Sequence, residues 1–272
     1  IAPGQGLTHA LPIAEPVNGY LHSFAVTDRY LMFYIGPYDY QAGSETFVDA
    51  FQWRPDQAGR VLLVDKSDLS MQRWFDAPTG FVFHCGEAFE CGDTIIARMS
   101  WYDSPEVMHS SMVGMMSDES SQPYPDFPRA HFASLMIHPN TGRVELEKTG
   151  VPMEFPVTDS RSVRNDRQTG AASYGLSHRD AAHPTYADAV VKFDGNGIEV
   201  GRYDLPLHHI AEELRLVADG SSAWLVGTFL DLKNRQTGLH VLNADQLGDG
   251  PVAVGRMPRS VALGFHGHFW PA

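Results

Sequence analysis

Short runs of apolar and β-branched residues, separated by turn residues, dominate the hydrophobic pattern of this chain. Each run is bounded by Gly, Pro, Asp or Asn, as is typical of β-strands. The clearest runs cover residues 30–35, 61–64, 80–84, 94–97 and 223–226. Because runs of this length recur along the chain, the pattern predicts an all-β protein.

Turn sequences separate several neighbouring strand runs, and each predicts a hairpin. They are Pro-Asn-Thr-Gly at 139–142, Asp-Gly-Asn-Gly at 194–197 and Asn-Arg-Gln-Thr-Gly at 234–238. Successive hairpins are typical of a sandwich, a barrel or a propeller. Helical signal is limited to residues 105–116 and 209–214. No linker composition divides the chain, so residues 1–272 are expected to form a single unit.

Charge and cysteine content narrow the range of partners. The chain has 272 residues, 43% of them apolar, and a net charge of −13, which argues against binding to nucleic acid. The same acidic charge, without a basic patch, allows at most weak contact with a membrane surface. No apolar stretch is long enough to span a bilayer. Two cysteines and no signal-peptide pattern predict free thiols and a cytoplasmic protein.

Three of the thirteen histidines lie within aromatic or apolar strand sequence, namely His22, His84 and His266. Burying an imidazole costs free energy unless both ring nitrogens are satisfied. A metal ion on one nitrogen and a carboxylate on the other remove that cost. Such sites suit iron, copper, nickel or zinc. The residues alone leave open whether these histidines share a metal or are structural.

Four motifs around these histidines resemble those of the carotenoid cleavage oxygenase family, and they occur in the family's order. They cover residues 21–30, 83–90, 153–156 and 264–267. Two positions depart from the family pattern, since Ser23 stands where Asp is usual and Glu87 where Asn is usual. The resemblance runs from about residue 18 to the C-terminus. It implies an all-β, seven-bladed β-propeller, of which this chain covers a part.

The resemblance also implies an Fe(II) ion on the propeller axis, held by four imidazoles. His22, His84 and His266 would be three of these ligands. The remaining histidine is expected upstream of Ile1, so an N-terminal segment with further blades would be required. That segment would bring the fourth ligand to the site.

Further residues are expected around the iron on the same grounds. Glutamates of the family accept hydrogen bonds from the ligand imidazoles. Glu154 fits one such position, and Glu212 is preferred over its neighbour Glu213 for another. Three aromatic residues next to the ligands are expected either to shape a substrate cavity or to fill the core, namely Phe24, Phe83 and Phe265.

The reaction implied by the resemblance is oxidative cleavage of a conjugated carbon–carbon double bond by O2, which gives two carbonyl products. The substrate would be a hydrophobic small molecule, either an apocarotenoid or a stilbene or related phenylpropanoid. The acidic charge favours the smaller phenolic compound. Two alternatives stay open at this point. One is isomerohydrolase-type chemistry on the same iron propeller, and the other is a non-catalytic β-propeller binding module.

Overall fold

The computed structural model describes residues 10–13, 15, 17–111, 128–159, 161, 169–179, 187–262, 264 and 266–269. Over these residues the chain forms four antiparallel sheets of four strands each and one separate two-stranded hairpin. The helical segments of the same residues are short. The prediction of an all-β fold is therefore confirmed.

Each sheet is a meander in which strands that follow one another along the chain lie side by side. The first sheet contains β1 (Ala25–Val26), β2 (Tyr30–Ile35), β5 (Gly59–Asp65) and β6 (Gln72–Ala77). The second contains β7 (Phe81–Cys91), β8 (Thr94–Tyr102), β9 (His131–His138) and β10 (Arg143–Pro152). The third contains β11 (Glu154–Thr158), β12 (Ser173–Ser177), β13 (Ala189–Phe193) and β14 (Glu199–Asp204). The fourth contains β15 (His209–Asp219), β16 (Ser222–Asp231), β17 (Gln236–Asn243) and β18 (Pro251–Arg256).

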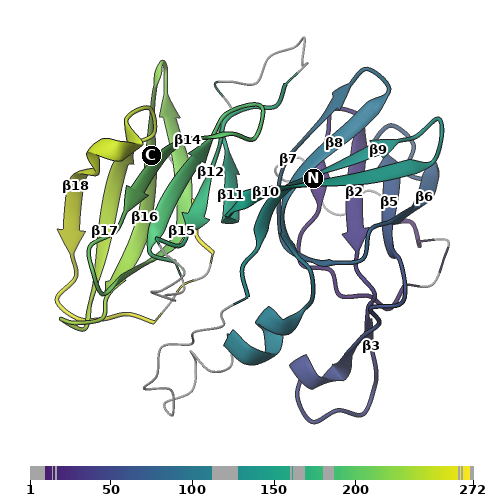
Figure 1. The fold of residues 1–272 in the computed structure, drawn as a ribbon, viewed down its shortest axis with the longest axis horizontal. Helices are drawn as coiled ribbons and strands as arrows, with labels where there is room; N and C mark the ends of the chain where they lie inside the picture. Colours follow the sequence, from purple (N-terminus) through teal and green to yellow (C-terminus); the bar gives the residue numbers. More distant parts are fainter. Residues whose placement is uncertain are drawn as a thin grey trace.

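The first strands of the four sheets lie next to one another. Strand β1 contacts β7, β7 contacts β11, and β11 contacts β15. The sheets thus stand side by side in chain order, from purple to yellow in Figure 1. This is the arrangement of propeller blades, in which the first strand of each blade lies nearest the axis.

Apolar side chains fill the spaces between neighbouring sheets. The first and second sheets bury Met32, Leu63, Met99 and Leu135. The second and third are joined by Phe132, Met153 and Phe193, and the third and fourth by Tyr174, Leu176, Leu214 and Leu225. These contacts bury large apolar side chains, which supplies most of the favourable free energy of folding.

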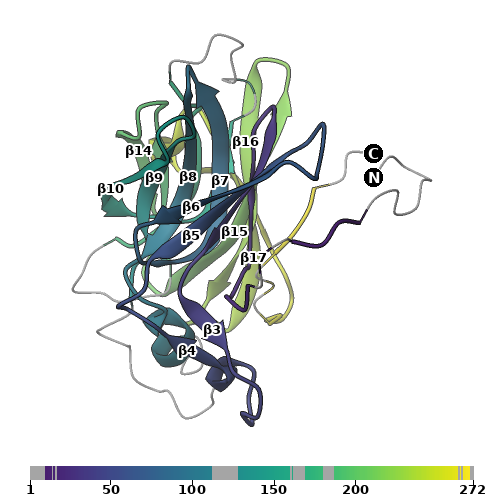
Figure 2. The same cartoon turned by 90° about the vertical axis from the view of Figure 1, so that its right-hand side faces the viewer.

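A hairpin projects from the first sheet between β2 and β5. It consists of β3 (Tyr38–Tyr40) and β4 (Phe51–Trp53), and the 3-10 turn η1 (Val48–Ala50) lies between them. Figure 2 shows the hairpin extending below the sheets. Its Tyr38 packs with Phe81 and with Val107 of the π-helical segment η2 (Val107–Ser111). Val107 and Met108 are both buried, so this segment contributes to the core beside the hairpin.

The structure confirms that hairpins form at the predicted places and contradicts one helix prediction. The predicted turn at 139–142 joins β9 to β10, and the turn at 194–197 joins β13 to β14. The turn predicted at 234–238 lies at residues 232–235, because β17 already begins at Gln236. Residues 209–214, predicted as helical, form the start of strand β15. Cys85 is a free thiol. Among the described residues, no helix has the length and apolar character needed to cross a bilayer.

Candidate metal centre

Three histidines from distant parts of the chain meet where the first strands of the sheets converge. His22 precedes β1, His84 lies in β7, and His266 lies in the segment after β18. Their ring centroids are separated by 4.9, 5.5 and 5.2 Å. One nitrogen of each ring lies within 4.8 Å of a nitrogen of each other ring. The structure therefore brings together the three residues predicted to bind the metal.

Two of the imidazoles are held by a carboxylate at Nδ1. The Nδ1 atom of His84 lies 2.7 Å from Oε2 of Glu154. The Nδ1 atom of His266 lies 3.4 Å from Oε2 of Glu213. A carboxylate can only accept a hydrogen bond, so beside a neutral imidazole it favours the tautomer with the proton at Nδ1, in which Nε2 is available to a metal. This is the arrangement of imidazoles that bind a metal through Nε2.

The third imidazole has a hydroxyl partner in place of a carboxylate. Nδ1 of His22 lies 3.2 Å from the hydroxyl of Tyr20, whose ring is stacked on the imidazole. Burial, followed by the nearby rings of His84 and His266, holds the pKa of His22 below its ordinary value. A lowered pKa favours the neutral imidazole, which is the form that binds metals.

The remaining Nε2 atoms fit a shared metal ion. Nε2 of His22 lies 3.3 Å from Nε2 of His266, and two nitrogens bound to one ion at about 2.1 Å are separated by about 3.0–3.4 Å. Nε2 of His84 is buried and has no hydrogen-bond partner among the described residues. Such an atom costs about 1–3 kcal/mol. Ligation would remove that cost, so the donor set fits a first-row transition metal.

Three inner strands carry a β-bulge at the residues that face this cluster. Across each bulge two residues oppose one, namely 83–84 opposite Ser100, 155–156 opposite Gly175 and 212–213 opposite Thr228. A bulge bends the strand and changes the direction in which its side chains point. At the second bulge Phe155 has a φ of 53°, an uncommon and costly conformation for an aromatic residue.

The third bulge determines which glutamate lies beside His266, and this is not the Glu212 that the sequence favoured. The carboxylate beside His266 belongs to Glu213, whereas Glu212 accepts from the backbone N–H of Gly264 at 3.0 Å and from the hydroxyl of Thr228. Both glutamates contact the segment after β18 because the bulge disrupts the alternation of side chains along β15. Burial raises the pKa of Glu212 above its ordinary value.

The three phenylalanines predicted near the ligands have different positions. Phe83 is buried, and its ring lies edge-on to His22 at 5.5 Å. Phe24 is half exposed, and its ring stacks on that of Phe33 at 5.3 Å rather than on an imidazole of the cluster. The chain before β1 has no regular strand pairing that would direct Phe24 to the side of His22. Phe265 lies outside the described residues.

Two aromatic residues of the site, Tyr20 and Phe155, were not predicted from the sequence. The ring of Phe155 lies 4.4 Å from that of His84 and 5.8 Å from that of His266. It also lines the pocket that contains all three imidazoles. The signal that could have indicated it is its place in the Glu154-Phe155-Pro156 motif, directly after a residue already assigned to the site.

The two departures from the family motifs do not place a charge at the cluster. The hydroxyl of Ser23 accepts from the backbone N–H of Cys85 at 3.3 Å, which ties the chain beside His22 to β7. Glu87 accepts from the backbone N–H of Ala171 at 2.6 Å and neighbours the buried guanidinium of Arg98. Its carboxylate therefore serves the contact between the second and third sheets.

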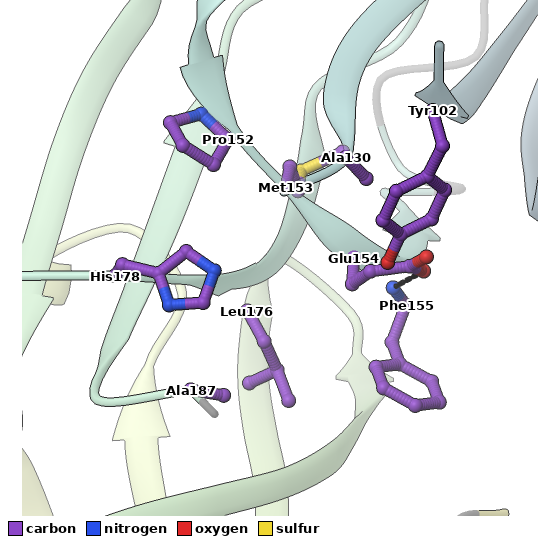
Figure 3. A pocket seen from close by; sticks show the side chains of 9 residues that line it. All are labelled: Tyr102, Ala130, Pro152, Met153, Glu154, Phe155, Leu176, His178 and Ala187. Atoms are coloured by element: carbon purple, nitrogen blue, oxygen red, sulfur yellow. Dashed lines mark hydrogen bonds between the residues drawn. The ribbon is translucent and has the colours of Figure 1, made fainter. Parts of the chain in front are cut away.

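A second pocket lies on the other side of Glu154. Figure 3 shows Tyr102 pointing its hydroxyl toward this carboxylate, which accepts from the backbone N–H of Phe155 at 3.0 Å. Oε1 of Glu154 is buried without a hydrogen-bond partner among the described residues. The lining is mostly apolar and consists of Tyr102, Ala130, Pro152, Met153, Glu154, Phe155, Leu176, His178 and Ala187. Glu154 therefore connects this pocket to His84.

The fold and the site define a propeller-type protein in which three imidazoles cluster where the inner strands meet. The family model described as retinal pigment epithelial membrane protein, RPE65, matches residues 2–271. The chain belongs to this family, which includes the carotenoid cleavage oxygenases, and the resemblance seen in the motifs is confirmed.

Several curated proteins are similar to nearly the whole of this chain, and each match covers about half of the relative. The carotenoid 9,10(9',10')-cleavage dioxygenase of Crocus sativus is 22% identical over 95% of this chain and 50% of the relative. The isoeugenol monooxygenase of Pseudomonas putida is 24% identical over 96% and 56%. The apocarotenoid-15,15'-oxygenase of Synechocystis is 23% identical over 93% and 52%. The chain thus spans about half the length of the curated relatives it matches.

Solved structures show the same fold. A variant of Synechocystis apocarotenoid oxygenase superposes with a TM-score of 0.77 at 21% identity, covering 92% of this chain and 53% of that chain. The cobalt-substituted form of that oxygenase gives a TM-score of 0.74 at 20% identity, covering 89% and 51%. The prediction of a β-propeller is confirmed, and the four sheets correspond to four of its blades.

Proposed function

We propose that this protein is a non-haem Fe(II) dioxygenase that cleaves a conjugated carbon–carbon double bond. The observation that carries the proposal is the convergence of His22, His84 and His266, each with an outer partner at Nδ1. Neutral imidazoles suit Fe(II), which when bound would supply the binding and activation of O2. The names of the relatives, which are dioxygenases and other oxygenases, support the same reaction class.

The reaction balances without a further reductant. One O2 molecule and one carbon–carbon double bond give two carbonyl groups, so both oxygen atoms end in the products. Glu154 and Glu213 would hold the ring protons of their imidazole partners at Nδ1, which fixes the rings and raises their basicity. Phe83 and Phe155 would form apolar walls that exclude water and help align the double bond.

For the substrate we favour a stilbene or another phenylpropanoid over an apocarotenoid. The net charge of −13 and the lack of a basic patch disfavour the anionic membranes in which long carotenoids dissolve. Isoeugenol, named in the Pseudomonas relatives, is a small phenolic alkene of this kind. Carotenoids, named in the plant relatives, are the competing class.

A fourth imidazole would complete the site. The cluster contains three histidines among the described residues, whereas the family resemblance implies four ligands. We propose that a segment outside these 272 residues supplies the fourth ligand together with further blades.

The test is an iron assay combined with oxygen labelling on the intact protein. After anaerobic loading with Fe(II), about one iron per molecule is expected. Isoeugenol, resveratrol and an apocarotenal are then supplied with ¹⁸O2, and ¹⁸O is expected in both carbonyl products of the preferred substrate. His84→Ala should remove iron and activity, and His138→Ala, on the surface of β9, should change neither.

Two outcomes would contradict the proposal. Isomerised or hydrated products that form without O2 consumption would indicate isomerohydrolase-type chemistry on the same scaffold. No iron uptake and no product with any of the three compounds would instead indicate a binding module with structural histidines.

A further inference from the structure

The segment after β18 carries His266 but forms no strand among its described residues. A segment without strand pairing loses conformational entropy when it is fixed, and other contacts must offset that loss. Here the contacts come from side chains of the neighbouring strands. At its start, the hydroxyl of Thr237 accepts from the backbone N–H of Val261 at 2.8 Å. Around His266 the contacts come from β15.

Three charged side chains of β15 hold the backbone on both sides of His266. Glu212 accepts from the N–H of Gly264 at 3.0 Å. Glu213 accepts from the N–H of Gly267 at 3.0 Å, and Arg215 donates through Nε to the carbonyl of the same glycine. The imidazole is therefore positioned by contacts to its flanking peptide groups as well as by its own contact with a carboxylate.

Arg215 has a second contact that links the segment to the centre. Its guanidinium donates to Oε2 of Glu213 at 2.9 Å, the oxygen that also faces Nδ1 of His266. Arg215 also lines the pocket of the three histidines. It can thus affect the position of this ligand through both the backbone of Gly267 and the carboxylate of Glu213.

We propose that Glu212 and Arg215 are positioning residues for His266. They fix the closing segment on β15 through backbone contacts, so that the third imidazole reaches the other two. The consequence for metal binding rests on the proposed function, but the docking of the segment does not. The bulge at 212–213 makes the arrangement possible, because it turns both glutamates toward the same segment.

Hydrogen exchange and cobalt binding, measured on the intact protein, test this proposal. In the metal-free form, Glu212→Ala and Arg215→Ala should speed amide exchange in peptides of residues 260–269 about tenfold or more. Both should weaken Co(II) binding roughly tenfold and alter its absorption spectrum. Glu212→Gln keeps a carbonyl acceptor for Gly264 and should resemble the wild type. Arg143→Ala, at an exposed position of β10, is the matched control and should change nothing.

Arg215→Lys separates the charge from the geometry. Lysine keeps one positive charge but lacks the planar fork that contacts two acceptors, so intermediate exchange is expected. This variant also decides the question if the alanine variants do not fold. Unchanged exchange and unchanged Co(II) binding in the Arg215 variants and Glu212→Ala would overturn the proposal. Faster exchange in a protein whose wild type binds no Co(II) would support the docking and contradict the metal centre alone.

Discussion

Two regions of the molecule bury imidazoles, and their surroundings differ. At the axis, Nδ1 of His84 is held by Glu154 at 2.7 Å, and the ring lies beside two other imidazoles. In the fourth sheet, His240 of β17 is 2% exposed, and its nearest aromatic neighbour is Phe229 at a centroid distance of 5.4 Å. In both rings Nε2 is buried without a hydrogen-bond partner among the described residues.

The difference shows that burial alone does not define a metal ligand. Burial, followed by the proximity of His209, lowers the pKa of His240 to about 4, so this ring stays neutral and isolated. At the axis, by contrast, the unpaired nitrogen of His84 has two similar donors nearby and a carboxylate behind it. The fourth-sheet region carries an energetic cost of burial, whereas the axial region can recover that cost by binding a metal.

Replacing one histidine in each region should give the largest difference in metal binding between the two regions. We expect His84→Ala to weaken Co(II) binding roughly a hundred- to a thousand-fold, because a four-ligand site binds with about 10–16 kcal/mol and one ligand supplies about a quarter of it. His240→Gln should leave binding unchanged. Anaerobic titration followed by Co(II) absorption measures both. Equal losses in the two variants would mean that the effect comes from general destabilisation.

Substituting the carboxylates that contact the imidazoles should lower metal affinity by a smaller factor. The two substitutions compare two positions within the axial region. Glu154→Gln should lower Co(II) affinity about 10–100-fold, since the amide cannot hold the ring proton as a carboxylate does. Glu213→Gln should cost less, about tenfold, because its contact is longer at 3.4 Å and Arg215 shares the oxygen.

The matched control is Glu145→Gln, because Glu145 contacts the imidazole of His138 at 3.1 Å on the surface. Isothermal titration of the three variants with Co(II) gives the order. A loss for Glu145→Gln as large as that for Glu154→Gln would contradict the outer-partner role.

The turn residues predicted the hairpins correctly, but the hydrophobic pattern at the start of β15 gave a wrong prediction of a helix. Turn residues at 139–142 and 194–197 identified their hairpins because their chemistry is local. In β15 the buried apolar residues are Ile210, Ala211 and Leu214, a spacing that fits one face of a helix. The bulge at 212–213 adds one residue to the strand, so Ala211 and Leu214 also lie on one face of the bulged strand. Local pattern cannot distinguish the two.

The site was predictable only as far as its motifs extend. The three clustered histidines follow from the resemblance, but the position of Glu213 rather than Glu212 beside His266 depends on a bulge that no local pattern indicates. His240 lies between Leu239 and Val241, a strand context much like that of His84. Only the meeting of strands distant along the chain separates a ligand from a buried structural histidine.

The acid response of His240 gives the smallest effect and tests the second region directly. Below its ordinary pKa of 6.5 the unfolded chain takes up a proton at this ring, whereas the folded chain does so only near pH 4. The free energy of unfolding therefore falls as the pH drops from about 6.5 toward 4. Between about pH 7.5 and about pH 5.5 the metal-free wild type should lose about 1 kcal/mol more than His240→Gln.

Urea unfolding at a series of pH values measures this slope, and any fixed cost of the buried amide cancels from it. All other titratable groups are the same in the two proteins and cancel as well. Parallel curves would mean that His240 gains a proton in the folded state as easily as in the unfolded chain. It would then have a partner for Nε2, and the contrast between the two regions would be lost. A steeper wild-type curve would establish that an isolated buried imidazole costs stability in acid, which supports reading the axial cluster as a site built to bind a metal.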